Sequence, residues 1–220
     1  MFLMRLRLLL LAWILAGAST LLCGSAIAES ASLVAEGWRH RVWSLYPIEK
    51  VKAAEALPLE PKAAGIALTA ARGEAEPFML VLRSETPLRQ VEVAPGALRM
   101  KGGEAVSGIA FDIKRVGYIL VDEPSGTRIK SPMPYATGTG EFPDPLLGGS
   151  GNARPGRNLQ FLVTATVPRD AKPGRYEGAL SLTFRNEGWM PAEKAQPCVI
   201  PLAVTVRAFR GRPADAVGGV

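Results

Sequence analysis

Apolar and polar residues alternate along three stretches in the second half of the chain. From Asn158 to Val167 every second residue is apolar, and only Leu162 interrupts the polar row between them. This period of two is that of a strand with one buried face. The pattern recurs from Arg175 to Phe184 and from Cys198 to Val206, where Pro201 falls in the outward row. Because proline donates no backbone hydrogen bond, we expect the last strand to lie at a sheet edge.

Shorter extended segments precede these three strands. They are residues 41–46, 65–70, 77–83, 89–93 and 110–121. In the last of them the apolar row changes phase, which predicts a bulge near Lys114 and Arg115. Only Ile48 to Ala56 could form a short helix, and it lies between Pro47 and Pro58.

About eight short strands separated by glycine and proline turns indicate an all-β fold, a two-sheet β-sandwich of immunoglobulin-like or jelly-roll type. We expect this sandwich over residues 41–209. One segment departs from the rhythm: residues 124–157 contain seven glycines and six prolines. We expect a long loop there, and loops of that length in compact domains usually bind something or are disordered. Residues 210–220 have no apolar period and are predicted to form a flexible tail.

The first 28 residues have the features of an export signal. Arg5 and Arg7 precede an apolar run from Leu8 to Ala16, and residues 26–28 (Ala-Ile-Ala) fit the site that a signal peptidase cuts. We therefore expect cleavage before Glu29, a lead-in over residues 29–40, and a secreted or periplasmic protein. The alternative is an uncleaved anchor, because residues 8–28 could just span a bilayer. Only in that case would the chain contact a membrane.

Composition excludes several classes of function. The chain is 48% hydrophobic and 21% charged, which suits a folded domain rather than a disordered one. Its formal charge of +6 falls to +4 without Arg5 and Arg7 and is scattered, so a nucleic-acid partner is not expected. With one histidine, a single cysteine beyond the signal and no clustered carboxylates, we expect no metal, no cofactor and no disulfide framework.

Candidates for catalysis are few. His40 lies between two arginines and is interpreted as a solvated residue at the start of a strand. Glu74 and Glu76 would share one strand face, and we expect them to pair with Arg72 or Arg83 or to be solvated. Asp144, between two prolines, is expected to order a turn. We therefore expect no catalytic residues in this chain.

Four segments in this order and spacing resemble the N-terminal β-sandwich domain of proteins related to glycoside hydrolase family 123. They are "AARGEAEPFMLVLRS" (residues 70–84), "RVGYILVDEPS" (115–125), "FPDPLL" (142–147) and "VPRDAKPGRYEGALSL" (167–182). The resemblance covers residues 41–209. In that family the catalytic Asp-Glu pair lies in a barrel domain that follows the sandwich and acts on β-linked N-acetylgalactosamine. We expect no such domain in this chain. The resemblance therefore implies an accessory sandwich.

At three positions the resemblance concerns single side chains. The resembled family commonly shows a glutamine where Met79 stands, so a contact made by that glutamine's amide is not expected here. Its asparagine and glutamine before an aromatic residue are roughly kept as Asn158 and Gln160, before Phe161. The resemblance also implies that residues 142–147 lie toward the catalytic domain. Exposed Phe142, Leu146 and Leu147 would then form a docking patch.

Aromatic residues outside the inward rows are candidates for sugar binding. They are Trp38, Trp43, Tyr135, Phe142 and Trp189; Trp189 is the most suggestive, because it shares a predicted turn with Asn186. Our leading hypothesis is a non-catalytic accessory sandwich that packs on a separately encoded catalytic barrel or remains from one. The alternatives are a free-standing carbohydrate-binding module that uses Trp189 and Asn186, and a structural or adhesion sandwich that offers the Pro201 edge to another strand.

Overall fold

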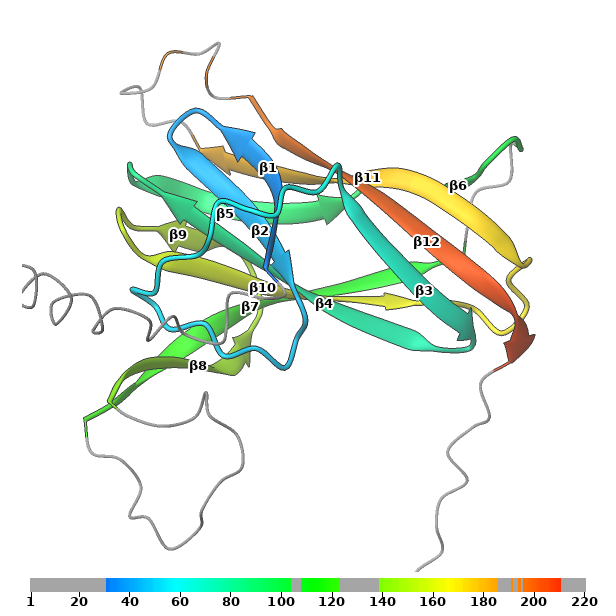
Figure 1. The fold of residues 1–220 in the computed structure, drawn as a ribbon, viewed down its shortest axis with the longest axis horizontal. Helices are drawn as coiled ribbons and strands as arrows, with labels where there is room; N and C mark the ends of the chain where they lie inside the picture. Colours follow the sequence, from blue (N-terminus) through cyan, green and yellow to red (C-terminus); the bar gives the residue numbers. More distant parts are fainter. Residues whose placement is uncertain are drawn as a thin grey trace, which may run out of the picture.

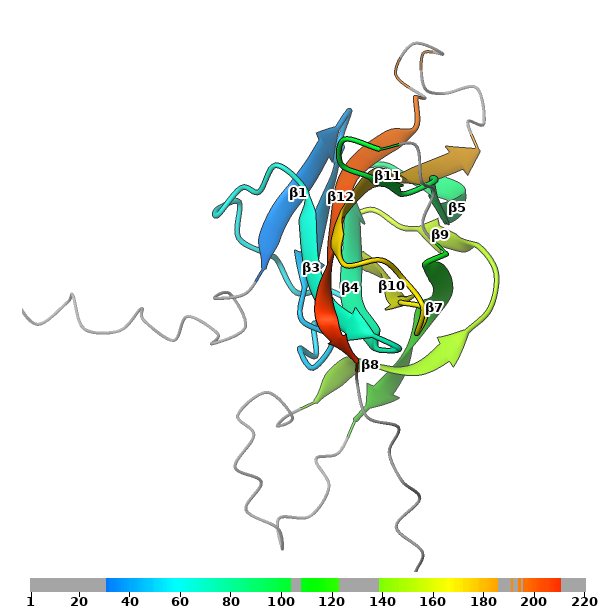
Figure 2. The ribbon, with the colours of Figure 1, turned by 90° about the vertical axis from the view of Figure 1, so that its right-hand side faces the viewer.

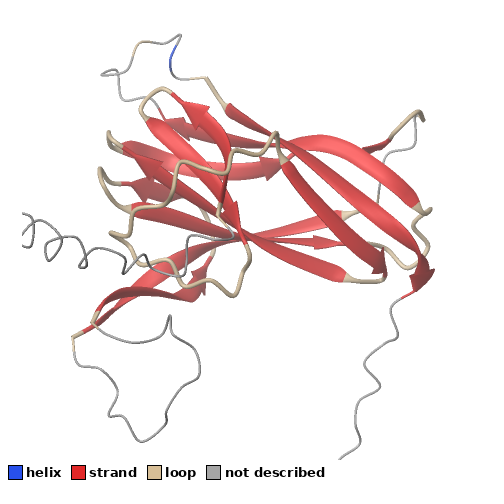
Figure 3. Ribbon diagram, viewed as in Figure 1, coloured by secondary structure: helices blue, strands red, loops and turns tan. Residues whose placement is uncertain are grey.

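The computed structural model describes residues 31–103, 108–122, 139–185, 191, 194 and 196–210. These residues form strands and loops without an α-helix (Figure 3). The strands are β1 (Ser32–Gly37), β2 (His40–Leu45), β3 (Ile66–Arg72), β4 (Ala75–Ser84), β5 (Leu88–Pro95), β6 (Arg99–Met100), β7 (Ala110–Val121), β8 (Gly140–Leu147), β9 (Gly151–Ala153), β10 (Asn158–Thr166), β11 (Gly174–Arg185) and β12 (Cys198–Arg210). They make two packed sheets (Figure 1), so the predicted all-β sandwich is confirmed.

The first sheet is antiparallel throughout and has the order β1-β2-β4-β10-β7-β8. Strand β10 lies near its middle, where Phe161 is opposite Leu80 of β4 and Arg115 of β7. The alternating segment that begins at Asn158 is therefore a central strand with a neighbour on each side. The turn after it does not make a hairpin, because β11 belongs to the other sheet.

The second sheet has the order β3-β12-β11-β5-β9, with β6 beside one end of β11. Strand β12 is antiparallel to β11 and parallel to β3, and the pairing with β3 starts at Leu202 opposite Ile66. The prediction that this strand forms an edge is therefore wrong. The missing N–H of Pro201 is tolerated because Pro201 lies one residue before that pairing begins. The long free edge that the adhesion alternative requires is occupied by β3.

The main core fills the space between the two sheets, which curve around a common interior in Figure 2. The inward rows predicted from the sequence supply it, and each of the following side chains is at least nine-tenths buried: Phe78, Leu80, Leu82, Leu159, Phe161, Val163, Leu180, Leu182, Ile200, Leu202, Val204 and Val206. Cys198 joins them as a buried free thiol. Burial of side chains of this size supplies most of the driving force for folding.

A second, smaller core lies on the outer face of the first sheet. Residues 46–65, which we call the covering loop, place Val51, Ala53 and Leu57 over this face. Their sheet partners include Trp43, Leu45, Met79, Val81 and Val116. The short helix considered for residues 48–56 is not formed. Only Val51 and Ala53 of this segment are buried, whereas Ile48, Ala54 and Ala56 are exposed, and Pro47, Pro58 and Pro61 limit helix propagation along the loop.

This second core explains the change of phase in β7. Phe111 and Ile113 pack on the main core, whereas Val116 packs on the outer one. Pairing of β7 with β10 runs without interruption from Ala110 to Val116, so the bulge predicted at Lys114 and Arg115 is wrong. The irregularity lies between β7 and β8 instead: Val116 is opposite Leu146 and Tyr118 is opposite Pro143, which leaves one extra residue on β8.

Several predicted boundaries change. The lead-in over residues 29–40 contains β1, and the loop predicted over residues 124–157 contains β8 and β9. Pro143 and Pro145 hid β8 from a pattern-based reading, but an edge strand with β7 on one side alone tolerates them. Asp144 is accordingly an exposed strand residue and not a turn residue. The predicted signal segment and the tail beyond residue 210 lie outside the described residues.

Candidate functional site

Asn158 and Gln160 hold the covering loop on the first sheet. The side-chain nitrogen of Asn158 donates to the carbonyl oxygens of Lys52 (2.9 Å) and Glu55 (2.7 Å). That of Gln160 donates to the carbonyl oxygen of Val51 at 2.6 Å and to the hydroxyl of Tyr118 at 2.7 Å. Both amides are buried. We call Asn158 and Gln160 the clamp, because their amides bind the covering loop to the sheet. The alternation alone suggested that this face of β10 is solvated.

Met79 extends this arrangement with an apolar contact. It is buried in the outer core beside Val81, on the same face as the two amides. Nearby, Arg83 donates to the carbonyl oxygen of Glu55 at 2.9 Å and to the side-chain oxygen of Asn158 at 3.2 Å. Burial raises the pKa of Tyr118 well above its ordinary value, so its hydroxyl stays protonated.

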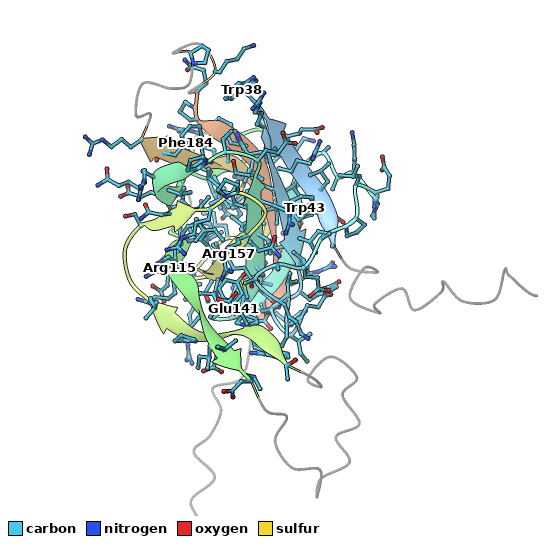
Figure 4. All side chains as sticks on the ribbon, turned by 90° about the vertical axis from the view of Figure 1, so that its left-hand side faces the viewer. Trp38, Trp43, Arg115, Glu141, Arg157 and Phe184 are labelled. Atoms are coloured by element: carbon cyan, nitrogen blue, oxygen red, sulfur yellow. The ribbon has the colours of Figure 1, made fainter. Side chains whose placement is uncertain are left out.

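Three arginines meet in a pocket beside the clamp. Arg115 comes from β7, whereas Arg154 and Arg157 come from the segment between β9 and β10. With Ser150 and Asn152 they line a cavity of about 330 Å³, which we call the arginine pocket. Figure 4 shows Arg115, Arg157 and Glu141 near one another and well separated from Trp38 and Phe184.

One carboxylate offsets part of the charge in this pocket. Glu141 of β8 accepts from Nη2 of Arg157 at 2.5 Å. The hydrogen bond with Arg157 lowers the pKa of Glu141, and the charges of Arg157 and Arg154 act in the same direction. The Nε atom of Arg115 is buried and has no hydrogen-bond partner within the described part of the chain. The pocket therefore carries excess positive charge and an unused donor.

A larger cleft opens between the sheets, where β1, β2 and β4 face β3. Its volume is about 730 Å³, and its lining is mostly apolar, with Ile66, Leu68 and Phe78 among its residues. Glu76 is the single carboxylate in this lining. Burial, with a contribution from the charge of Glu74, raises the pKa of Glu76. Exposed Tyr46 and Ile48 stand at the rim.

The acidic residues considered for catalysis lie in different environments. A side-chain oxygen of Glu74 accepts from the backbone N–H of Ala71 at 2.5 Å, so it orders a turn and pairs with neither Arg72 nor Arg83. Glu76 lies in the cleft between the sheets, whereas Asp144 lies on β8. Among the described residues, no group of three or more histidine, cysteine or acidic residues is arranged to hold a metal ion.

The predicted binding residues have different outcomes. Trp189, Asn186 and Tyr135 lie outside the described residues. Trp43 is buried in the outer core, where Nε1 donates to the carbonyl oxygen of Pro58, so it is no surface platform. Leu146 and Leu147 of the predicted docking patch are exposed, whereas Phe142 is half-buried beneath the ammonium group of Lys52.

His40 is not the solvated residue that its neighbours suggested. It is 4% exposed, its Nδ1 donates to the carbonyl oxygen of Trp38 at 2.9 Å, and its ring contacts that of Phe184 edge-on. Its ring also lies against Gly37, where any side chain would collide with it. The flanking arginines at 39 and 41 suggested a solvated position. His40 is buried nevertheless, because residue 40 of β2 points toward the interior.

Burial of His40 predicts a loss of stability in mild acid. Burial lowers its pKa, and the hydrogen bond to Trp38 opposes that shift only in part. The unfolded chain thus binds the proton more readily, so the free energy of unfolding falls as pH drops below about 6.5, by at most about 1.4 kcal/mol per pH unit. Urea unfolding at pH 7.5, 6.5 and 5.5 measures this. His40→Asn should flatten the profile, and an unchanged slope in that variant would assign the effect to other groups.

Within the described residues, no helix is long and apolar enough to cross a membrane. This finding concerns residues beyond the predicted signal segment.

No family model and no curated protein matches the chain. A family 123 glycoside hydrolase from Clostridium perfringens, studied for glycolipid glycan hydrolysis, is 19% identical with a TM-score of 0.49, over 64% of this chain and 22% of that chain. The Niemann-Pick type C2 protein of the Japanese carpenter ant is 11% identical with a TM-score of 0.27, and the match covers 84% of this chain and 96% of that protein. A PapD-like domain of human CEP192 is 12% identical with a TM-score of 0.28, and the match covers 72% of this chain and 96% of that domain.

The match therefore covers only about a fifth of the length of the glycoside hydrolase. The resemblance to that enzyme is weak, and at these identities the likenesses extend no further than the β-sandwich fold.

Proposed function

We propose that this chain is a non-catalytic accessory β-sandwich of a glycoside-hydrolase-like system, and that it docks on a separately encoded catalytic domain. The observation that carries the proposal is an exposed apolar surface on two neighbouring strands. It consists of Ile119 and Leu120 of β7 and Leu146 and Leu147 of β8, which we call the β7–β8 ledge. Because side chains alternate along a strand, Leu120 and Leu146 point to one face of this strand pair, and Ile119 and Leu147 point to the other. The exposed fraction is 68% for Leu120 and 54% for Leu146. Clusters of this kind on soluble proteins mark interaction sites.

The backbone of β8 favours docking through side chains. Strand β8 is the last strand of its sheet, and its two prolines cannot donate to an added strand. Gly117 of β7 lies opposite the extra residue of β8, and a side chain at that position would collide with Pro145. The prolines therefore protect the edge against pairing and leave the leucine side chains available to a partner.

Charge on the β7–β8 ledge should disrupt the complex. The tagged mature chain, without residues 1–28, is used to capture partners from envelope extracts of the cells that express it, with identification by mass spectrometry. We expect a protein with a carbohydrate-cleaving domain, captured at least tenfold less by the double variant Leu120→Glu/Leu146→Glu, because each glutamate must be desolvated in an apolar interface. Val199→Glu, at an exposed position of β12, is the matched control and should capture normally.

Two outcomes would contradict this proposal. The first is equal capture by the ledge variant and the wild-type chain, or capture of proteins that lack such a domain. The second is hydrolysis of an aryl N-acetylgalactosaminide by the purified mature chain at a rate that Glu76→Gln abolishes. The second result would make the cleft between the sheets an active site.

A further inference from the structure

The arginine pocket has more cationic donors than the protein itself uses. Arg157 is engaged with Glu141, and Arg154 influences the same carboxylate through space. Arg115 keeps a buried Nε without a hydrogen-bond partner in the described residues. Three guanidinium groups line this pocket and one carboxylate pairs with one of them, so an additional anion would offset their mutual repulsion. Partly buried donors without partners are costly, which also favours a ligand that accepts from them.

The backbone around the pocket brings these groups together. Gly151 of β9 lies so close to Arg115 that a Cβ atom there would be 2.8 Å from its Cδ. Gly156 takes a positive φ of 72°, and its N–H donates to the carbonyl oxygen of Ser84 at 3.1 Å. The N–H of Arg157 donates to the carbonyl oxygen of Arg154 at 3.1 Å. These contacts fix the turn that carries two of the three arginines.

We infer that the arginine pocket binds an oxyanion, a carboxylate or sulfate group carried by a small ligand such as an acidic sugar. The planar donor fork of arginine fits the oxygens of these groups and is charged at every physiological pH. A volume of about 330 Å³ is at the lower end of the range for small-molecule sites. Ser150 and Asn152 in the lining add polar side chains that can contact hydroxyl groups. This inference does not depend on whether the chain docks on a catalytic domain.

The test is to titrate small ligands into the mature chain in low-chloride buffer. Binding is measured by calorimetry and by the shifts of amide NMR signals. The probes are inorganic sulfate, glucuronate, N-acetylgalactosamine 6-sulfate and neutral N-acetylgalactosamine. We expect saturable binding of the three anions and none of the neutral sugar. Arg154→Gln should weaken anion binding about tenfold, the effect of removing one charge-assisted hydrogen bond. Arg154 is exposed, so this variant leaves the fold intact.

A matched variant separates local contacts from overall charge. Arg207→Gln removes the same charge from an exposed position on β12, and it should leave affinity unchanged. Arg115→Lys keeps the charge but loses the donor fork and should also weaken binding. Equal affinity for sulfate and the acidic sugars would support a site for the anionic group alone, whereas tighter sugar binding would support a glycan site. Equal losses in the Arg154 and Arg207 variants, equal binding of the neutral sugar, or no saturable binding would overturn the inference.

Discussion

Phe161→Ala is expected to lower the free energy of unfolding by about 3–5 kcal/mol, the range for truncation of a buried phenylalanine. Phe161 lies on the central strand of the first sheet and is 2% exposed, with the main core on its side of the sheet. The removed ring leaves a cavity that two hydrogen-bonded neighbouring strands cannot close. Urea unfolding followed by circular dichroism measures the change.

Phe209→Ala is the matched control, because the same side chain is 66% exposed on β12. It should change the free energy of unfolding by no more than about 0.5 kcal/mol. If Phe161→Ala does not fold, Phe161→Leu leaves a smaller cavity and should still destabilise the protein measurably. Similar effects of the Phe161 and Phe209 substitutions would contradict the placement of the main core.

The inward row that contains Phe161 could be predicted from the sequence because a central strand imposes a strict period of two. The same holds for Leu180 and Leu182 of β11, which are fully buried as the alternation predicts. Strands β8 and β9 could not be found in this way, because β8 contains two prolines and β9 spans three residues. Strand β8 is long enough but has no clear alternation, and β9 is too short to show one.

The functional candidates were harder to predict, for a different reason. Asn158 and Gln160 occupy polar positions of an amphipathic strand, where solvent is the ordinary environment. Their contacts come from a loop more than 100 residues earlier, and no local pattern reports such a contact. The arginine pocket likewise combines Arg115 with two arginines about 40 residues later, inside a segment that was expected to be a loop. Of the predicted docking patch, Leu146 and Leu147 are exposed as expected and Phe142 is half-buried, whereas the exposure of Ile119 and Leu120 was not predicted.

The clamp and the arginine pocket share one strand end. Asn158 starts β10, and Arg157 immediately precedes it, so the backbone of one segment directs an amide under the covering loop and a guanidinium into the pocket. The N–H of Asn158 also donates to the carbonyl oxygen of Ala53 at 2.7 Å. The covering loop therefore stabilises the strand end from which the pocket is built. Loss of the clamp should disturb the pocket as well.

Asn158→Ala should accordingly reduce the free energy of unfolding by about 2–3 kcal/mol and release the covering loop. Two hydrogen bonds to the loop carbonyls and a longer one from Arg83 are lost, each worth about 1 kcal/mol, and the removed amide leaves a small cavity. Trp43 reports the change, because its ring is 2% exposed in the outer core and its Nε1 donates to the loop carbonyl of Pro58. We expect a red shift of the tryptophan emission and faster proteolysis within residues 46–65, at urea concentrations below the main transition.

Asn158→Asp separates hydrogen bonding from packing. Aspartate has the size of asparagine but no N–H donor, and it would direct a carboxylate oxygen at the carbonyl oxygens of Lys52 and Glu55. It should still destabilise the protein: Arg83 can donate to one carboxylate oxygen, but the other faces two carbonyl oxygens and has no donor there. Asn152→Ala removes an exposed asparagine of β9 that accepts from the N–H of Gln90 and makes no contact with the covering loop, so it should leave the tryptophan emission unchanged. A stable Asn158→Asp variant with an intact loop would show that the amide fills space and that its hydrogen bonds do not hold the covering loop in place.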